Sequence, residues 1–281
     1  MKIIQSFAQF KEGSPYSNKN VFLNFYSFYL SYLTLNKYYG NVTMICNEEA
    51  YNSFIKYIPY DEIIIKENKN DINFWNAYKI DAMKIIDDDI IHVDSDVFIF
   101  DDLFSEFINN DYWDIMVQDI TPAKDSYIVM GDFVKDNEKF LSENDIIYLN
   151  EYDNRFTSCG TFGIKKRVRD IYFNAVDKLH TGIKNGVVTG KNLSILMEEL
   201  TAYLVSIHYN LKLYDILTHE LIVKYNKSRA GDIKKYTHLW FGYKFTDRNI
   251  TLMKNKVRQE FPHNYSLIDK YEMEVLNEIK I

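Results

Sequence analysis

The chain has 281 residues and a mass of 33.4 kDa, which is enough for one large domain with a full-sized core. Apolar residues make up 47% and charged residues 26% of the sequence, a balance that excludes disordered and fibrous proteins. The 40 acidic and 33 basic residues give a net charge of −7. This argues against nucleic acid as the main partner, because neutralisation of the phosphate backbone by basic residues supplies most of that affinity.

The first hundred residues alternate between strand and helix patterns, with short connections. Strands are expected at 2–7, 41–46, 62–65 and 90–93, and helices at 20–39, 48–57 and 74–86. Gly40 is expected to end the first helix, and the run EIII at 62–65 is expected to be a short buried strand. Strands that alternate with helices predict an α/β fold with a mostly parallel sheet and helices on both faces.

The second half of the chain has a less regular pattern. Further strands are expected at 114–118, 160–164 and 212–216, and a helix at 197–209. A polar segment at 135–154 separates the first two of these strands. The tail from Thr251 is expected to form two helices broken at Pro262. The pattern therefore predicts one α/β domain over residues 1–250 and a helical C-terminal extension over 251–281.

Cysteine usage and hydropathy indicate the compartment. Cys46 and Cys159 are too few for a disulfide framework and have no metal-ligand spacing, so both are expected to be buried thiols in a reducing environment. The most apolar stretch, 21–39, contains six polar residues and is too polar to span a membrane. The first residues lack a signal-peptide pattern. We therefore expect a cytoplasmic protein without a membrane span.

The most informative stretch is IIHVDSDVFIF at residues 90–100. An apolar strand runs directly into Asp94 and Asp96. In an extended segment the side chains of residues i and i+2 lie on the same side, so these two carboxylates can converge on one cation. Ligands of open α/β sheets bind beyond the carboxyl ends of the strands, where this pair falls. The alternative is a solvated turn that closes the strand.

The block FWNAYKIDAMKIIDDDIIHVDSDVFIF at residues 74–100 resembles the core of GT-A-fold glycosyltransferases, which use nucleotide sugars, and is most similar to glycogenin-like enzymes. In that family a helix with a lysine precedes a strand that ends in the metal-binding Asp-x-Asp. The resemblance implies a GT-A-like, Rossmann-like catalytic domain over residues 1–250. It also implies that Lys79 and Ser95 belong to the nucleotide-sugar site, that Asp94 contacts ribose and metal, and that Asp96 binds metal and diphosphate.

A second match lies far downstream, in HLWFGYK at residues 238–244. It resembles the family's His-x-x-Gly-x-x-Lys segment, with Gly242 one residue late and without the following Pro-Trp. The resemblance implies that His238 is the third metal ligand and that Lys244 contacts the diphosphate. An imidazole beside two carboxylates suits Mn²⁺ better than Mg²⁺, which prefers oxygen ligands. The alternative is that His238, beside Trp240, is an ordinary packed or surface residue.

Three further regions are expected at the site. The segment TSCGTFG at 157–163 resembles the family's Asn-x-Gly segment, so that Gly160 lines the sugar pocket, with Ser158 in place of the usual asparagine. Glu198 and Glu199 open a helix where the family places an acidic residue that faces donor sugar and acceptor, and a solvated helix face is the alternative. Ser6, in the first strand, is expected to line the base pocket.

These observations predict a metal-dependent glycosyltransferase that moves a sugar from a nucleoside-diphosphate sugar to a glycan or another hydroxyl acceptor, with Mn²⁺ or Mg²⁺ as cofactor. The glycogenin-like matches favour retention of configuration, whereas inversion would need Glu198 or Glu199 as the base. One alternative is a phosphatase of the HAD type with Asp94 as nucleophile, although Phe98 stands where that class carries threonine. Another is a non-catalytic module that binds a nucleotide sugar or glycan.

Overall fold

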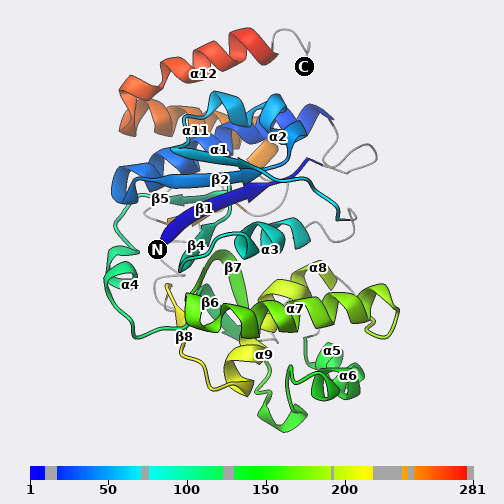
Figure 1. The fold of residues 1–281 in the computed structure, drawn as a ribbon. Coiled ribbons are helices and arrows are strands. Elements are labelled where there is room, and N and C mark those ends of the chain that lie inside the picture. Colours follow the sequence, from blue (N-terminus) through cyan, green and yellow to red (C-terminus); the bar gives the residue numbers. More distant parts are fainter. Residues whose placement is uncertain are drawn as a thin grey trace. The chain divides into compact units, whose positions relative to one another are not determined.

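The structure is a computed structural model that describes residues 1–9, 18–70, 76–122, 130–190, 193–217, 236–239 and 244–276. The chain divides into two compact units. Unit 1 contains Met1, Asn73–His92 and Phe104–His219, and unit 2 contains Lys2–Ile72, Val93–Leu103 and Glu220–Ile281. Each unit is therefore built from segments that lie far apart in the sequence, as the colours of Figure 1 show.

Unit 2 is built on three parallel strands. Strands β1 (Lys2–Phe7), β2 (Val42–Cys46) and β3 (Glu62–Ile65) lie in the order β3-β2-β1. The five residues of β2 are fully buried, as expected of a strand with a neighbour on either side. The expectation of a buried strand at 62–65 is wrong, because β3 is an edge strand whose residues are half-buried or exposed.

A long helix covers this ladder. Helix α1 (Asn18–Tyr39) ends at Gly40, whose φ of +58° makes glycine the favoured residue at this C-cap. The expected helix at 48–57 consists of α2 (Glu48–Ser53), capped by the Asn47 side chain, and a 3₁₀ turn at Ile55–Tyr57. Unit 2 also contains a two-stranded antiparallel ladder of β5 (Val97–Ile99) and β9 (Tyr236–His238), which the sequence patterns did not predict.

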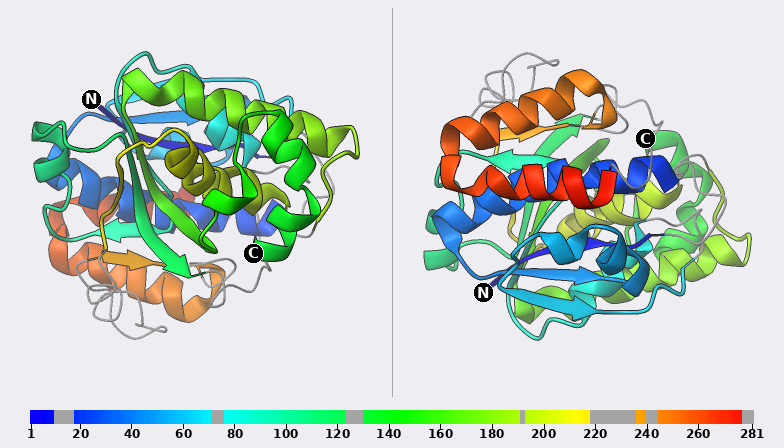
Figure 2. Two further views of the ribbon diagram at one scale, coloured as in Figure 1. Left: turned by 90° about the horizontal axis from the view of Figure 1, so that it is seen from below. Right: turned by 90° about the horizontal axis from the view of Figure 1, so that it is seen from above.

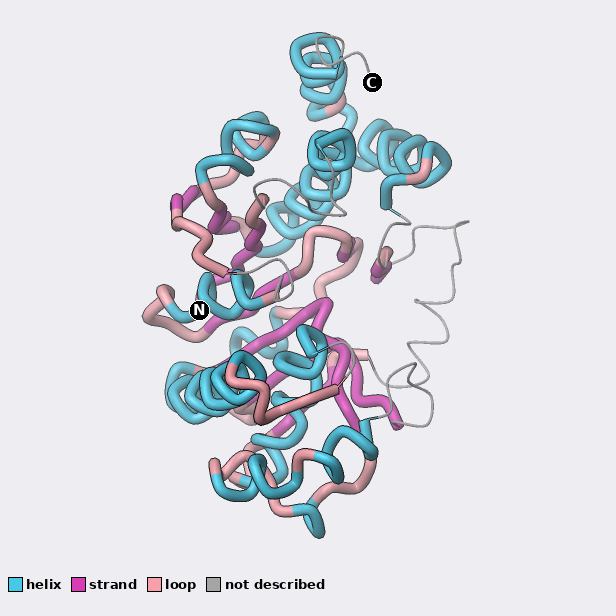
Figure 3. The backbone as a smooth tube through the Cα atoms, turned by 90° about the vertical axis from the view of Figure 1, so that its right-hand side faces the viewer, coloured by secondary structure: helices cyan, strands magenta, loops and turns pink. Residues whose placement is uncertain are grey.

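The C-terminal segment is helical, as expected, and packs on α1 (Figures 1 and 2). Helix α11 (Asp247–Glu260) begins four residues before the expected start, because the Thr246 side chain caps it, and a 3₁₀ turn at Pro262–Asn264 breaks the helix as predicted. Helix α12 (Ser266–Tyr271) continues into a π-helical turn at Glu272–Leu276 (Figure 3). The Tyr271 ring stacks on Phe25 at 3.8 Å and anchors this segment.

Unit 1 contains β6 (Ile115–Pro122), β7 (Arg155–Ile164) and β8 (Leu213–Asp215). Strand β6 pairs antiparallel with β7 and parallel with β8. The register of β6 and β7 shifts between Val117 and Asp119, where Gln118 lies opposite Cys159–Thr161. Strand β4 (Ile90–Val93) is fully buried and carries the chain from unit 1 into unit 2.

Helices surround the strands of unit 1. They are α3 (Ala77–Lys84), α4 (Ser105–Asn109), α5 (Met130–Asp136), α6 (Glu138–Glu143), α7 (Arg169–Lys184), α8 (Leu193–Ile195) and α9 (Thr201–His208). The polar segment at 135–154 holds short helices, including a 3₁₀ turn at Leu149–Glu151. A second 3₁₀ turn, Lys166–Val168, leads into α7.

The structure confirms an α/β fold with mostly parallel strands and a helical C-terminus. Cys46 and Cys159 are free and buried, as predicted. No helix in the described ranges is both long enough and apolar enough to cross a membrane. The division into a domain over 1–250 and an extension over 251–281 stays a prediction.

Candidate metal and nucleotide site

The two aspartates lie in a tight turn, whereas the sequence pattern predicted an extended segment. The Val97 amide donates a hydrogen bond to the Asp94 carbonyl at 3.0 Å, so residues 94–97 form a β-turn between β4 and β5. Ser95 is only 9% exposed at the centre of this turn, and Asp94 is half-buried. The turn closes β4, as in the alternative interpretation, but Ser95 and Asp96 are largely buried and not solvated.

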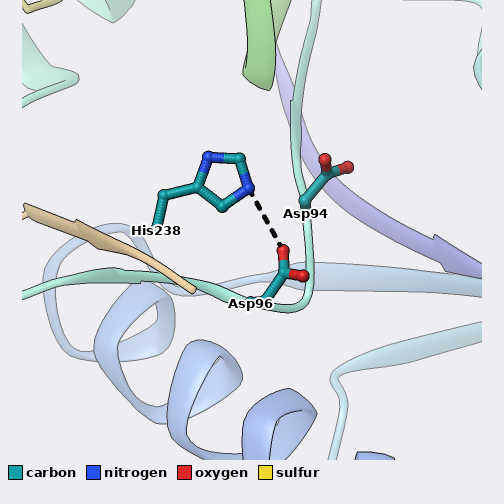
Figure 4. Close-up of side chains that lie close together, drawn as sticks. All are labelled: Asp94, Asp96 and His238. Atoms are coloured by element: carbon teal, nitrogen blue, oxygen red, sulfur yellow. Dashed lines mark ion pairs between the residues drawn. The ribbon is translucent and has the colours of Figure 1, made fainter. Parts of the chain in front are cut away.

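Strand pairing brings the distant histidine to this turn. His238 is the last residue of β9 and stands opposite Val97, the residue that follows Asp96. The Leu239 amide also donates to the Asp96 carbonyl at 2.9 Å, which extends the pairing by one residue. Figure 4 shows the His238 ring directed at the Asp96 carboxylate, with Asp94 at the end of β4. The position of the imidazole is thus set by backbone hydrogen bonds.

The Asp96 carboxylate contacts two basic side chains. Its Oδ1 lies 3.5 Å from Nε2 of His238, and its Oδ2 lies 3.2 Å from Nζ of Lys244. All three side chains are between 11% and 13% exposed. Burial alone would raise the pKa of Asp96, but the charge of Lys244 and the hydrogen bond and charge of His238 outweigh it and hold the pKa well below its usual range. The carboxylate is therefore ionised at neutral pH.

The three predicted ligands could hold a metal ion. One ligand atom from each of Asp94, Asp96 and His238 lies within 4.8 Å of the other two. Two carboxylate oxygens and one imidazole nitrogen form a donor set for a divalent cation such as Mn²⁺. Lys244 places a fixed positive charge at the same carboxylate, so it would compete with a bare cation and would complement one that carries a polyanion.

A buried hydrogen-bond network holds the backbone on both sides of the turn. Gln5 of β1 is fully buried, and its amide donates to the Val93 carbonyl at 3.3 Å and to the Ser31 hydroxyl at 2.8 Å. Ser31 of α1 donates to the Val97 carbonyl at 2.6 Å. The Tyr60 hydroxyl donates to the side-chain oxygen of Gln5 at 2.7 Å. These side chains hold the turn in place, because they donate hydrogen bonds to the Val93 and Val97 carbonyls on either side of it.

Sequence reasoning missed this network, although a signal was present. The polar residues that interrupt the apolar stretch of α1 include Asn24, Ser27, Ser31 and Thr34. Their spacing of three and four residues places them on one face of the helix, and all four are buried. Thr34 accepts a hydrogen bond from the Ile99 amide of β5 at 3.2 Å. A polar stripe on an otherwise apolar helix therefore indicates that the helix packs against backbone groups with hydrogen-bonding needs.

The other predicted site residues with ionisable side chains, Lys79, Glu198 and Glu199, lie in unit 1. Lys79 of α3 is buried, and its ammonium group lies 2.6 Å from Oε1 of Glu198 and donates to the Cys159 carbonyl at 2.7 Å. The prediction that Glu198 and Glu199 open a helix is wrong. Both lie in a π-helical turn, Leu196–Leu200, between α8 and α9. Turns of this kind are frequent at functional sites.

Glu199 occupies an unfavourable environment for a charge. Burial, and after it the charge of Glu198, raises the pKa of Glu199 well above the usual range. Asp119 of β6 adds to this effect, while a hydrogen bond from the Cys159 backbone and the charge of Lys79 oppose it. Glu199 is therefore protonated over a range of pH in which an exposed glutamate is ionised. Asp119, which is only 4% exposed, is a further buried acid that the sequence analysis missed.

The other predicted contacts are backbone or small residues. Gly160 is buried in β7, within the stretch where the register with β6 shifts. Ser6 is half-buried in β1, opposite Ile45 of β2. Gly242 lies outside the described residues. The structure thus brings Asp94, Asp96, His238 and Lys244 together in unit 2 and pairs Lys79 with Glu198 in unit 1.

Comparisons with known proteins place this chain in a family. A family model, described as a family of unknown function (DUF6734), matches residues 1–271. The chain belongs to the DUF6734 family. No curated protein matches the sequence.

Among solved structures, the apo form of mouse xyloside xylosyltransferase 1 is similar to this DUF6734 protein at 11% identity and a TM-score of 0.42. The similarity covers 80% of this chain and 86% of the other.

Proposed function

We propose that this DUF6734 protein is a metal-dependent glycosyltransferase of the GT-A type, which transfers a sugar from a nucleoside-diphosphate sugar to a hydroxyl acceptor. The proposal is carried by one observation. The residues of the Asp-x-Asp motif and of the distant His-to-Lys segment meet in unit 2, with Asp94, Asp96 and His238 within 4.8 Å of one another and Lys244 on Asp96. This geometry supports the roles that the resemblance implies for these four residues.

The chemistry follows from the charges at this turn. The bond from sugar to diphosphate breaks as negative charge develops on the departing diphosphate, so positive charge must be placed there. A bound Mn²⁺ would supply it as a Lewis acid, held by Asp94, Asp96 and His238. Lys244 adds a point charge that is already held in place by Asp96. In a protein of net charge −7, such a local concentration of positive charge is required to bind a polyanion.

The carboxylates of unit 1 favour retention of configuration. An inverting reaction needs an ionised carboxylate that is able to accept the proton of the acceptor. Lys79 pairs with the Glu198 carboxylate at 2.6 Å, and burial raises the pKa of Glu199, which disfavours its ionised form. Both environments oppose the free, ionised carboxylate that an inverting reaction requires. We assign both to contacts with donor sugar and acceptor, together with Gly160.

The test is a thermal-shift titration with nucleoside diphosphates and nucleotide sugars, each with and without Mn²⁺. A ligand that binds only the folded state raises the unfolding temperature, so no knowledge of the acceptor is required. We expect a shift for one nucleotide family that depends on Mn²⁺. The absence of a shift with every nucleotide, in a protein shown to be folded, would contradict the proposal.

Three variants assign the residues in the same titration. Asp96→Asn should abolish the Mn²⁺-dependent shift, and His238→Ala should weaken it less severely. Lys244→Met should bind Mn²⁺ alone more tightly, because a competing charge is removed, yet bind the metal–nucleotide complex more weakly. A Lys244→Met protein with both affinities unchanged would remove Lys244 from the site.

Turnover separates the competing functions. A glycosyltransferase releases nucleoside diphosphate from its donor in the presence of an acceptor. A non-catalytic module would bind the same nucleotide sugar without releasing it for any acceptor in a panel. A covalent phosphate trapped on Asp94 would instead indicate a phosphatase of the HAD type.

A further inference from the structure

The edge strand of unit 2 has an unusual sequence for its position. Strand β3 lies at the end of the order β3-β2-β1, and no other strand among the described residues pairs with its outer edge. In the right-hand view of Figure 2 the ladder runs from dark blue β1 to cyan β3. Proteins usually protect such edges with charged residues, proline or bulges. The strand instead reads Glu-Ile-Ile-Ile, and Ile65 is 50% exposed.

The backbone of β3 determines which residues are able to pair outward. The Lys66 amide donates to the Cys46 carbonyl of β2 at 2.8 Å, so Lys66 directs its hydrogen-bonding groups inward. Because these directions alternate along a strand, Ile64 also faces β2, whereas Ile63 and Ile65 direct their N–H and C=O groups away from it. The free edge thus offers two donors and two acceptors, at residues that flank Ile64.

The segment 62–66 is complementary to itself in an antiparallel register. If two copies align about Ile64, then Ile63 lies opposite Ile65 of the second copy and forms the hydrogen-bonded pairs that the outward groups require. In the same register Glu62 lies opposite Lys66 of the second copy, and this occurs twice by symmetry. Opposite charges and β-branched residues are favourable cross-strand pairs.

We propose that β3 is a homodimer interface, in which the β3 strands of two copies pair antiparallel about a two-fold axis at Ile64. The pairing is isologous, so each copy contributes the outer edge of β3 and the assembly closes as a dimer. Glu62 is 48% exposed while it contacts Lys2 at 3.1 Å and Thr43 at 2.9 Å, so its carboxylate is held beside the edge. The interface lies within unit 2 and does not depend on the proposed catalytic function.

Disulfide trapping tests the register directly. In the proposed dimer the two Ile64 residues form a pair without hydrogen bonds, about 4.5 Å apart between Cα atoms, which a disulfide is able to bridge. Ile64→Cys should therefore form a covalent dimer under mild oxidation, while the buried Cys46 and Cys159 stay unreacted.

Ile65→Cys is the matched control. Ile65 is more exposed than Ile64, but in the proposed register the Ile65 residues of the two copies are diagonal neighbours, about 7–8 Å apart. Random collisions would cross-link Ile65→Cys more readily. Cross-linking of Ile65→Cys that equals or exceeds that of Ile64→Cys would overturn the proposed pairing.

Sedimentation measures the dimer without a cross-link. The native chain should sediment at twice its mass of 33.4 kDa and dissociate on dilution. Ile65→Lys should shift it to a monomer with an unchanged circular dichroism spectrum, whereas Val187→Lys, at an exposed valine of unit 1, should leave the dimer intact. A native chain that is monomeric at every concentration, or an Ile65→Lys variant that stays dimeric, would refute the interface.

Exchange of the charges at positions 62 and 66 provides a further test, in which two variants are compared alone and as a mixture. Glu62→Lys and Lys66→Glu each place two like-charged pairs across the axis, so each protein alone should be monomeric. Their equimolar mixture restores opposite charges at both positions and should contain the heterodimer. Two folded monomers that do not associate on mixing would exclude this register.

Discussion

Asp96 shows how a single residue can be ionised although it is largely buried. Desolvation opposes its charge, but Lys244 at 3.2 Å and His238 at 3.5 Å provide enough positive potential to hold its pKa low. The same contacts orient both carboxylate oxygens before any ligand binds. Asp96 is therefore already ionised and oriented to coordinate a divalent cation.

Glu199 provides the opposite case and a prediction about pH. Its pKa is raised because burial, and then the charge of Glu198, disfavours the carboxylate in the folded state. The folded chain therefore binds this proton more tightly than the unfolded chain, and stability falls as pH rises above the unfolded pKa of about 4.3. The slope from one such group is at most about 1.4 kcal/mol per pH unit.

Glu199→Gln removes this titration and keeps the shape of the side chain. We expect the variant to gain stability relative to the native protein as pH is raised from 5 to 8, measured by urea unfolding at each pH. A difference that is constant over this range would show that Glu199 is already ionised in the folded protein.

At the scale of elements, the π-helical turn Leu196–Leu200 depends on contacts from two other elements. The Thr157 hydroxyl of β7 donates to the Glu199 carbonyl at 2.5 Å, and Lys79 of α3 joins Glu198 to the carbonyl of Cys159. A π turn is less favourable than regular helix and persists where such contacts hold it. The buried ion pair thus joins a helix, a strand and the turn within unit 1.

This pair leads to a prediction about stability. Lys79→Met leaves the buried carboxylate of Glu198 without its partner at 2.6 Å and should destabilise the protein by about 3–5 kcal/mol. The double variant Lys79→Met/Glu198→Leu removes both charges and should recover most of this loss, as measured by chemical denaturation. A double variant as unstable as Lys79→Met alone would mean that packing, and not the unpaired charge, dominates.

At the scale of the whole molecule, the predicted metal ligands all belong to one of the two units. Asp94, Asp96 and His238 lie in unit 2, on segments separated by more than a hundred residues. Binding of Mn²⁺ alone should therefore slow local opening of the elements that carry its ligands.

Hydrogen exchange measures this localisation. Mn²⁺ is expected to increase protection in peptides that cover β5 and β9 and to leave the peptide of α7 in unit 1 unchanged. Asp96→Asn serves as the control and should show no metal-dependent protection. Equal protection in all peptides would indicate a global effect of the ion and not a site at this turn.

The sequence by itself determined the order and type of most elements and the identity of the candidate ligands. Hydrophobic periodicity and the Gly40 and Pro262 signals are local, so α1, β2 and the break before α12 could be predicted. The composition likewise predicted two buried thiols. These features depend on neighbouring residues and on the requirement to bury apolar surface.

The tertiary structure decided what depends on contacts between distant segments. Strands β5 and β9 have three residues each and no distinctive pattern, so only their pairing places His238 at Asp96. Three other features could not be predicted from the sequence, because burial and charge partners arise from packing. They are the turn at 94–97, the exposed edge of β3 and the pairing of Lys79 with Glu198. Local sequence patterns indicate which residues are candidate ligands, but hydrogen bonds between distant segments set the positions of these residues.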